Sequence, residues 1–142
     1  MIYQRSPGMP KAIREYGCYF MALGEAAAKR NTSHLYTVKD FIAVYEKSIE
    51  SGWMSEDCFI YDPAAILMAF GLKAEFVGKF HSFDRVCGDG EFEIVHYKYA
   101  PRNWDHFGGG NGMGFWTYDP WGVSITFTQG QFHSKRVFRE IA

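Results

Sequence analysis

Helical and strand-like patterns occupy different halves of this 142-residue sequence. Three helices are predicted before residue 72, over residues 18–30, 38–51 and 63–70. Strand-like segments follow, over residues 74–80, 92–99, 115–118 and 123–128. A parallel sheet needs strands and helices that alternate along the chain, whereas this sequence separates them. We therefore predict an α+β fold in which N-terminal helices pack on a C-terminal antiparallel β-sheet.

Capping residues support the bounds of two of these helices. Thr37 is a preferred N-cap residue, and Gly52 is a residue of the type that commonly follows a helix end. Asp62 and Pro63 provide a cap and a first-turn proline for the next helix, which Gly71 ends. Both helices are interpreted as structural elements that pack on a core.

Length, charge and composition limit the classes of protein that this chain can represent. Its 142 residues, of which 47% are hydrophobic, fit one domain over residues 1–142. Fifteen Lys and Arg residues balance sixteen Asp and Glu residues without forming a basic stripe, so nucleic acid is not an expected partner. The N-terminal residues lack the apolar core of a signal peptide, and no apolar run reaches the thickness of a bilayer. We therefore expect a cytoplasmic protein with no membrane partner, in an oligomeric state that the sequence leaves open.

The cysteines point to chemistry at one position rather than to cross-linking. Cys18, Cys58 and Cys87 are odd in number and widely spaced, which is typical neither of a disulfide framework nor of a zinc site. We expect reduced thiols, no metal and no other cofactor. Cys18 follows Gly17 at the predicted start of an apolar helix, where the backbone dipole and free N–H groups favour a thiolate. Cys18 is therefore a candidate nucleophile, and a small residue that starts a buried helix is the alternative.

A glycine-rich segment predicts a β-hairpin. Its spacing matches neither the dinucleotide fingerprint nor the phosphate-binding loop. Asn111-Gly112 is instead the preferred pair for a two-residue turn, because both positions need positive φ. That turn places His106 opposite Thr117 and puts Asp119 diagonally across from His106 on the same face. Asp119 can then orient the imidazole, which serves as the base for a nucleophile, whereas a three-residue loop would separate the two side chains.

Simpler roles exist for both members of this pair. His106 is alternatively a surface-loop histidine, and Asp119 is alternatively the first residue of an Asp-Pro turn. His96, in the middle of a predicted strand, is the reserve candidate for the base. The predicted hairpin places no acidic residue beside the other histidines. His34 and His133 are predicted in polar turns, and His81 follows a strand.

These motifs resemble those of papain-like cysteine peptidases of the compact bacterial type, which includes the bacteriocin-leader-processing peptidases. The matching segments are a cysteine at a helix start, a His-aromatic pair and an Asp-Pro-Trp motif: Gly17-Cys18, His106-Phe107 and Tyr118-Asp119-Pro120-Trp121-Gly122. The opening Tyr16-Gly17-Cys18-Tyr19-Phe20 also resembles an uncharacterised family carried by spirochaetes and their phage-like elements. The resemblance implies a papain-like domain in which Cys18 attacks a carbonyl, His106 transfers the proton and Asp119 orients His106.

One part of the family pattern is not at its usual place. Papain-like peptidases carry a glutamine shortly before the cysteine, and it donates a hydrogen bond to the oxyanion. Here that stretch reads Lys11-Ala12-Ile13-Arg14. Removal of one such donor costs roughly two to three orders of magnitude in rate. The candidates for the missing donor are Gln4, Tyr16 and Arg14, acting with the backbone N–H of Cys18.

Three hypotheses of function follow from these residues. The leading one is a cysteine hydrolase that cleaves an amide bond of a peptide or peptidoglycan stem peptide through a thioester acyl-enzyme, with Trp104 and Trp121 as candidates for the cleft walls. A phage-type delivery route would bring such an enzyme to the cell envelope. The displaced glutamine favours the alternative, a catalytically inactive papain-like binding or structural module of phage origin. A metal-dependent hydrolase that uses His96, His106 and Asp119 is the third, and it lacks a helical histidine pair.

Overall fold

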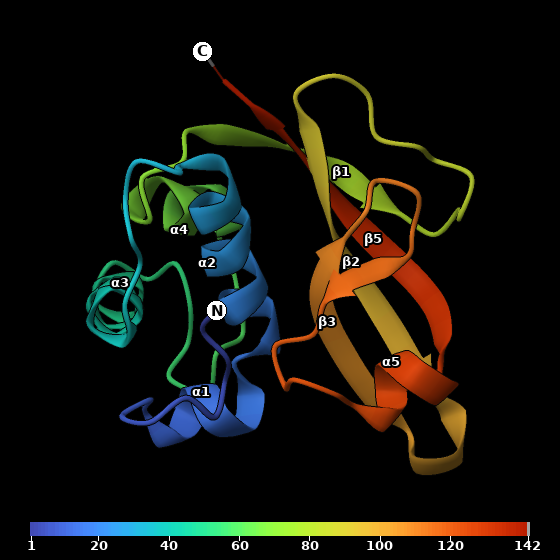
Figure 1. Ribbon diagram of the computed structural model, residues 1–142, viewed down its shortest axis with the longest axis horizontal. Helices are drawn as coiled ribbons and strands as arrows, with labels where there is room; N and C mark the ends of the chain where they lie inside the picture. The colour runs from blue at the N-terminus through green and yellow to red at the C-terminus, as the bar shows by residue number, and fades with distance from the viewer. Residues whose placement is uncertain (142) are drawn as a thin grey trace.

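The computed structural model describes residues 1–141 and has the predicted α+β fold (Figure 1). Four helices form one side of the molecule: α1 (Lys11–Tyr16), α2 (Cys18–Arg30), α3 (Val38–Glu50) and α4 (Pro63–Ala69). The other side is an antiparallel sheet of β1 (Ala74–Phe80), β2 (Glu91–Tyr99), β3 (Trp104–Gly110), β4 (Trp116–Tyr118) and β5 (Gln131–Glu140). A short 3₁₀ turn (Ala100–Arg102) joins β2 to β3, and helix α5 (Ile125–Gln129) precedes β5.

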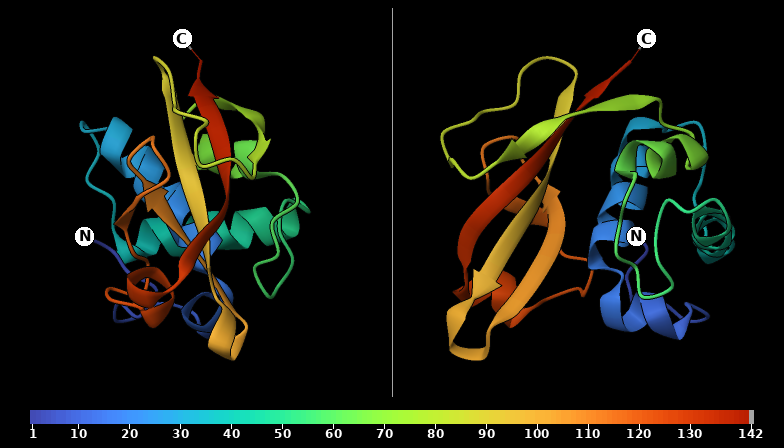
Figure 2. Two further views of the ribbon diagram at one scale, coloured as in Figure 1. Left: turned by 90° about the vertical axis from the view of Figure 1, so that its right-hand side faces the viewer. Right: turned by 180° about the vertical axis from the view of Figure 1, so that it is seen from behind.

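The strand order is β1-β5-β2-β3-β4, and each neighbouring pair is antiparallel. The C-terminal strand β5 is therefore inserted between β1 and β2, whereas β3 and β4 form one edge of the sheet. Helix α2 lies between the sheet and α3 in Figure 1 and in the right-hand view of Figure 2, and it packs on β3. The fold thus brings the start of α2 beside the edge of the sheet that carries His106.

Two predicted elements differ from the structure near the C-terminus. Residues 123–128, predicted as a strand, instead contain α5, because Ser124 caps a short helix and accepts the N–H of Phe127 at 3.3 Å. No strand was predicted over residues 131–140, which form β5. His133 therefore lies in a strand and not in a polar turn. Near the N-terminus, α1 forms directly before Gly17, where no helix was predicted.

The predicted helix caps are confirmed. Thr37 and Asp40 form a capping box at the start of α3, in which the Thr37 N–H donates to Asp40 Oδ2 at 2.8 Å. At the start of α4, Asp62 Oδ1 accepts the N–H of Ala65 at 3.1 Å. These side chains satisfy backbone donors that a helix leaves unpaired, so both helices begin where the sequence predicts.

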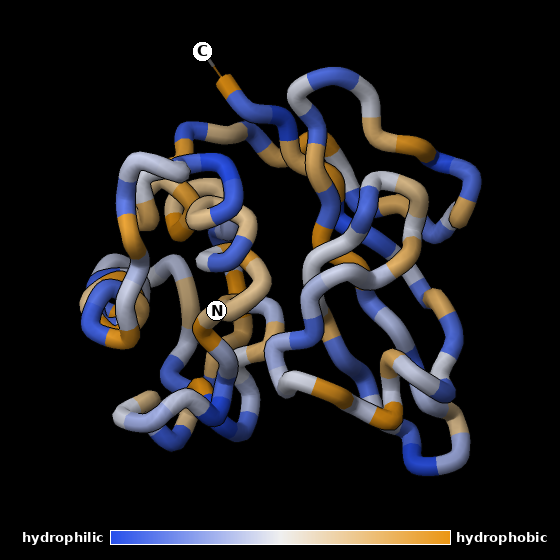
Figure 3. Tube along the Cα trace, viewed as in Figure 1, coloured by the Kyte–Doolittle hydropathy of each residue, from blue (hydrophilic) through white to orange (hydrophobic). Residues whose placement is uncertain are grey.

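The main core lies between α2 and its neighbours. Figure 3 shows α2 as largely apolar in the middle of the molecule, whereas the turn between β2 and β3 is hydrophilic. Phe20 of α2 is fully buried, and its ring lies 6.3 Å from that of Phe41 and 5.4 Å from that of Phe70. Buried aromatic rings in such contact stabilise a fold beyond their buried area. This packing fixes α2, and with it the position of Cys18.

A buried ion pair joins the two central strands. Lys135 Nζ of β5 donates to Glu93 Oε1 of β2 at 2.9 Å, and both side chains are fully buried. Glu93 Oε2 accepts the N–H of Gly114 at 2.8 Å, in the loop between β3 and β4. Two buried charges are tolerated because each has its counter-charge, and removal of one partner leaves an uncompensated charge.

No helix within residues 1–141 combines the length and the apolar composition needed to cross a membrane.

We expect Lys135→Met to lower the free energy of unfolding by about 3–5 kcal/mol, because the Glu93 carboxylate is left buried without a counter-charge. The double variant Lys135→Met/Glu93→Gln should be less destabilised, since a neutral amide oxygen still accepts from Gly114. Urea denaturation followed by tryptophan fluorescence measures both values. A double variant that is as unstable as the single one would contradict the assignment of the loss to an unpaired charge.

Candidate active site

Cys18 is the first residue of α2, directly after a sharp junction between two helices. Gly17 is buried there, and a Cβ on it would lie 2.7 Å from the Cα and O atoms of Ile13, so the last turn of α1 leaves no room for a side chain at this junction. The first hydrogen bond of α2 runs from the N–H of Met21 to the carbonyl of Gly17 at 2.8 Å. The N–H groups of residues 18–20 therefore have no acceptor within the helix and point toward the space before it. Unpaired N–H groups at the start of a helix are a general place for negative charge to bind.

His106 and Asp119 form a buried hydrogen-bonded pair. His106 Nε2 lies 2.7 Å from Asp119 Oδ1, and the two residues are 8% and 3% exposed. Asp119 also accepts the N–H of Trp121 on Oδ1 at 2.9 Å and the N–H of Ser124 on Oδ2 at 2.8 Å. Burial opposes ionisation of this carboxyl, but its hydrogen bonds with His106 and Ser124 outweigh burial and lower its pKa. Asp119 is thus held as a carboxylate that fixes the ring.

The loop that connects β3 to β4 is not the predicted two-residue turn. The N–H of Asn111 donates to the carbonyl of Phe115 at 2.9 Å, so the loop contains the three residues 112–114. Gly112 and Gly114 both have positive φ in this loop. The predicted pairing of His106 with Thr117 is therefore wrong. A three-residue loop by itself would also turn His106 and Asp119 to opposite faces.

A β-bulge restores the predicted relation between the two side chains. Gly110 pairs with Trp116, but Gly109 pairs with Tyr118, which leaves Thr117 as an extra residue in β4. Since side chains alternate between the two faces of a sheet, this extra residue reverses the face to which the following side chains point. It thereby undoes the reversal caused by the three-residue loop. The loop and the bulge together return the aspartate to the face of the histidine.

Cys18 completes the arrangement from the helical side. Its side chain interacts with the His106 ring and raises the pKa of that ring, and because Nε2 is engaged by Asp119, Nδ1 is the ring nitrogen that is available to the thiol. Burial disfavours the charged ring, but the hydrogen bond with Asp119 and the interaction with Cys18 outweigh burial and raise the pKa of His106 to about 9. The imidazole is therefore charged at neutral pH, and an imidazolium next to a sulfur stabilises a thiolate.

An open cleft gives access to this site. Its volume is about 860 Å³, and both Cys18 and His106 line it. The two predicted wall residues, Trp104 and Trp121, line it as well, together with the exposed ring of Tyr16. The structure adds two exposed apolar side chains that the sequence analysis did not single out, Val123 and Ile125. A substrate that enters this cleft meets apolar and aromatic walls next to the thiol.

Gln4 reaches the cleft although it lies far from Cys18 in the sequence. The N-terminal segment folds back, and the N–H of Gln4 donates to the carbonyl of Pro120 at 2.8 Å. Gln4 is 2% exposed and lines the cleft. Its Nε2 donates to the carbonyl of Ile13 at 3.1 Å and makes a long contact with that of Arg14 at 3.5 Å. One amide N–H is thus only weakly engaged.

The other candidates for the oxyanion donor differ in position. Arg14 does not line the cleft with Cys18 but a neighbouring hollow that it shares with Arg5 and Lys11. Tyr16 lines the cleft, and its side chain is largely exposed. Gln4 is therefore the buried candidate of the three.

His96 lies on the other face of the sheet, so the reserve candidate is not part of this site. His96 pairs with Phe107, and Tyr97 pairs with His106, which places the two histidines on opposite faces. His96 Nε2 contacts Asp105 Oδ1 at 2.7 Å, but burial dominates and lowers the pKa of His96 to about 4. The metal hypothesis required His96 beside His106 and Asp119. Within residues 1–141, no three His, Cys, Asp or Glu side chains converge to hold a metal ion.

Ser124 is a site residue that the sequence analysis missed. Its N–H holds the Asp119 carboxylate, while its hydroxyl caps α5. A serine four residues after an Asp-Pro pair is a recognisable N-cap candidate, but the neighbouring β-branched residues favoured a strand. The simpler role of Asp119 also holds, because its carbonyl accepts the N–H of Gly122 at 2.9 Å in a turn. One residue thus both starts the turn and orients His106.

Comparison with known proteins assigns the chain to a family. The model of a family described as "Protein of unknown function, DUF261" matches residues 1–140. The chain belongs to the DUF261 family. Searches of curated proteins and of solved structures each found no match. The function of this DUF261 chain is therefore inferred from the geometry of its own site.

Proposed function

We propose that the protein is a papain-like cysteine peptidase or amidase that hydrolyses an amide bond of a peptide substrate. One observation carries this proposal: the His106 ring hydrogen-bonds with Asp119, and both His106 and Cys18 line the same open cleft. A nucleophile, a base and a group that orients the base are the parts that acyl transfer requires.

The arrangement of elements supports the papain-like type. The cysteine starts a helix that packs on β3, the histidine lies on β3, and the aspartate follows β4. The contact of Asp119 with Nε2 leaves Nδ1 for the sulfur, so that the proton can move between Cys18 and the ring without breaking the contact with Asp119. A peptide or a peptidoglycan stem peptide is the proposed class of substrate.

In the proposed reaction, the Cys18 thiolate attacks the carbonyl carbon of the amide and forms a C–S bond. The C–N bond then breaks, and the His106 imidazolium gives its proton to the leaving amine. Water attacks the resulting thioester while His106 takes a proton from it. Cleavage of the C–S bond releases a carboxylic acid and returns the thiolate beside a protonated ring.

Two donors are placed to stabilise the oxyanion of the tetrahedral intermediate. The backbone N–H of Cys18 is one of the unpaired donors at the start of α2. The second is Nε2 of Gln4, which lines the same cleft. Gln4 would then replace the glutamine that papain-like peptidases carry closer to the cysteine in sequence. Although Gln4 is more distant in sequence, the N-terminal segment folds back and brings it to the same cleft.

A non-catalytic peptide-binding module is the second candidate, and the hydrogen bonds of Gln4 favour it. Nε2 of Gln4 contacts two backbone carbonyls, and Oε1 is buried without a hydrogen-bond partner in residues 1–141. An amide held in this way stabilises the N-terminal segment without any reaction. The two candidates differ in what they require of Cys18, because only the enzyme needs a reactive thiolate.

Alkylation by iodoacetamide tests the reactive thiolate. At pH 6.5, Cys18 should react faster than free cysteine, because the neighbouring imidazolium stabilises its thiolate. His106→Asn should slow this reaction about ten-fold or more, and Cys18→Ser should remove it. Cys58 and Cys87 are controls within the same chain, since burial raises the pKa of their thiols to about 12 and about 11.

Mass spectrometry of the digested protein assigns the label to each cysteine in this experiment. A Cys18 that reacts no faster than free cysteine, or as fast without His106 as with it, would eliminate the enzyme and leave the binding module.

Gln4→Ala tests the proposed oxyanion donor. With a substrate selected from a quenched fluorescent peptide library, kcat should fall by about 10²–10³-fold while KM changes little, because the donor acts on the transition state. Gln131→Ala, at an exposed position of β5, is the matched control and should leave both constants unchanged. An unchanged kcat in a correctly folded Gln4→Ala variant would assign Gln4 to structure alone.

A further inference from the structure

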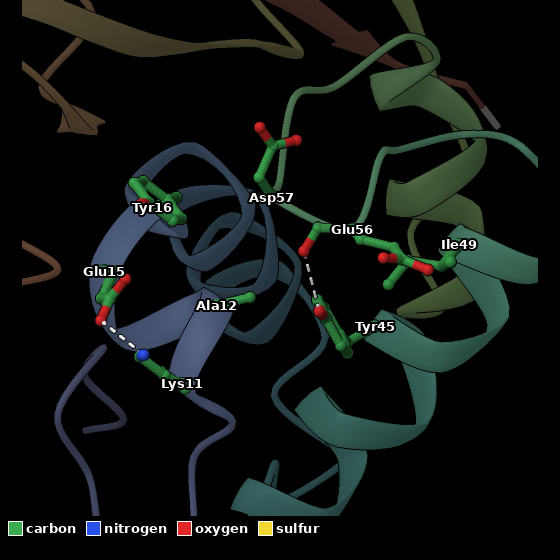
Figure 4. Close-up of a pocket in the computed structure, with 8 residues that line it drawn as sticks. All are labelled: Lys11, Ala12, Glu15, Tyr16, Tyr45, Ile49, Glu56 and Asp57. Carbon is green, nitrogen blue, oxygen red and sulfur yellow. Dashed lines mark hydrogen bonds and ion pairs between the residues drawn. The ribbon is translucent and has the colours of Figure 1, made fainter.

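A second hollow adjoins the Cys18 cleft across the end of α1. Its volume is about 540 Å³, and it is bordered by α1, α3 and the loop that carries Glu56 and Asp57 (Figure 4). Glu15 and Tyr16 line both this hollow and the cleft that contains Cys18. The two depressions therefore share a border at the C-terminal turn of α1, which a side chain of an extended peptide bound at Cys18 would cross to reach the hollow.

The hollow carries an excess of negative charge. Glu15, Glu56 and Asp57 contribute three carboxylates against the single ammonium group of Lys11. Lys11 Nζ lies 3.7 Å from Glu15 Oε1, and Figure 4 shows this pair at one side of the hollow. Glu56 and Asp57 form no ion pair with any residue of the described chain, 1–141. A cation in the hollow would supply their counter-charge.

The walls of the hollow suit the long stem of a cationic side chain. Ala12, Tyr16, Tyr45 and Ile49 provide its apolar lining. Lysine and arginine pack their methylene groups along apolar surface and keep the charged end near polar groups. Tyrosine rings also attract ammonium and guanidinium groups over their faces. Apolar walls with a carboxylate rim therefore suit a lysine or arginine side chain better than a neutral or acidic one.

The loop that supplies the carboxylates is held by its own hydrogen bonds. The N–H of Ser55 donates to the carbonyl of Phe59 at 2.9 Å, and the N–H of Cys58 donates to the carbonyl of Ser55 at 3.0 Å. Cys58 has a φ of 65°, in the left-handed region that is unfavourable for a residue with a side chain. The hydroxyl of Tyr45 donates to the carbonyl of Glu56 at 3.1 Å and ties the loop to α3. The carboxylates are thus presented by an ordered turn.

We propose that this hollow is a subsite that selects a lysine or arginine side chain of the peptide substrate, on one side of the scissile bond. The inference rests on the proposed function and adds the substrate class to it. Glu56 and Asp57 are the residues that determine this specificity, and they lie outside the group formed by Cys18, His106 and Asp119.

Binding to a variant without the thiol tests the subsite separately from catalysis. The probes are fluorescein-labelled octapeptides of alanine and glycine that carry one lysine, moved through each position, and twins in which that lysine is acetylated. Fluorescence anisotropy with Cys18→Ala should show one position at which the lysine peptide binds about three- to ten-fold more tightly than its twin. The preference should weaken as salt is added, because the carboxylates are exposed.

Matched variants assign the preference to the hollow. Glu56→Gln/Asp57→Asn in the Cys18→Ala background should abolish it. Asp84→Asn/Asp89→Asn makes the same change in net charge on the loop between β1 and β2, on the other side of the molecule from α1 (Figure 1), and should preserve it. Equal affinity for lysine and acetyl-lysine peptides, no measurable binding of either, or equal loss in both double variants would overturn the subsite.

The outcomes for the subsite and for the proposed function are distinguishable. A lysine preference in Cys18→Ala combined with an unreactive Cys18 in the wild type would support the hollow and reject the peptidase. Cleavage of peptides by the wild type without a preference for lysine or arginine would reject the hollow and support the peptidase.

Discussion

The carboxylate of Asp119 is the point on which the site depends. It accepts hydrogen bonds from the His106 ring, from the N–H of Trp121 and from the N–H of Ser124, so one buried charge joins β3, the turn after β4 and the start of α5. The next residue, Pro120, accepts the N–H of Gln4 and so brings the N-terminal segment to the same place. A buried carboxylate needs several donors, and here those donors are the elements that form the cleft.

The sequence predicted the residues of the candidate site better than it predicted the backbone conformation that brings them together. A glycine before an apolar helix and an Asp-Pro motif after a hairpin identified Cys18 and Asp119, because each reflects a local backbone requirement. The predicted two-residue turn paired the wrong residues across the hairpin, yet it placed His106 and Asp119 on the same face, as the structure does. The three-residue loop and the bulge at Thr117 each reverse the face to which the following side chains point, so their effects cancel. A bulge leaves little trace in a single sequence. The sequence also left open whether Gln4 lies near Cys18, because this depends on how the N-terminal segment folds back.

The missed elements of the fold have physical causes of the same kind. Strand β5 escaped prediction because Lys135 occupies a fully buried position, where the pattern of alternation would place an apolar residue. Glu93, forty-two positions away in the chain, neutralises that lysine and makes its burial possible. Helix α5 was mistaken for a strand because its β-branched residues outweighed the cap of Ser124, and tertiary contacts with the carboxylate decide the outcome. Helices α3 and α4, whose caps are local, were predicted correctly.

The charge state of the His106 ring separates an activated cysteine from an inert one most directly. Nitrogen NMR of selectively labelled histidine reports whether one or both ring nitrogens carry a proton. We predict a doubly protonated ring at pH 7 that titrates near pH 9, and a lower titration in Cys18→Ala, because the interaction with Cys18 contributes to the raised pKa. A ring that is neutral at pH 7, or that titrates identically with and without the thiol, would contradict the thiolate–imidazolium pair.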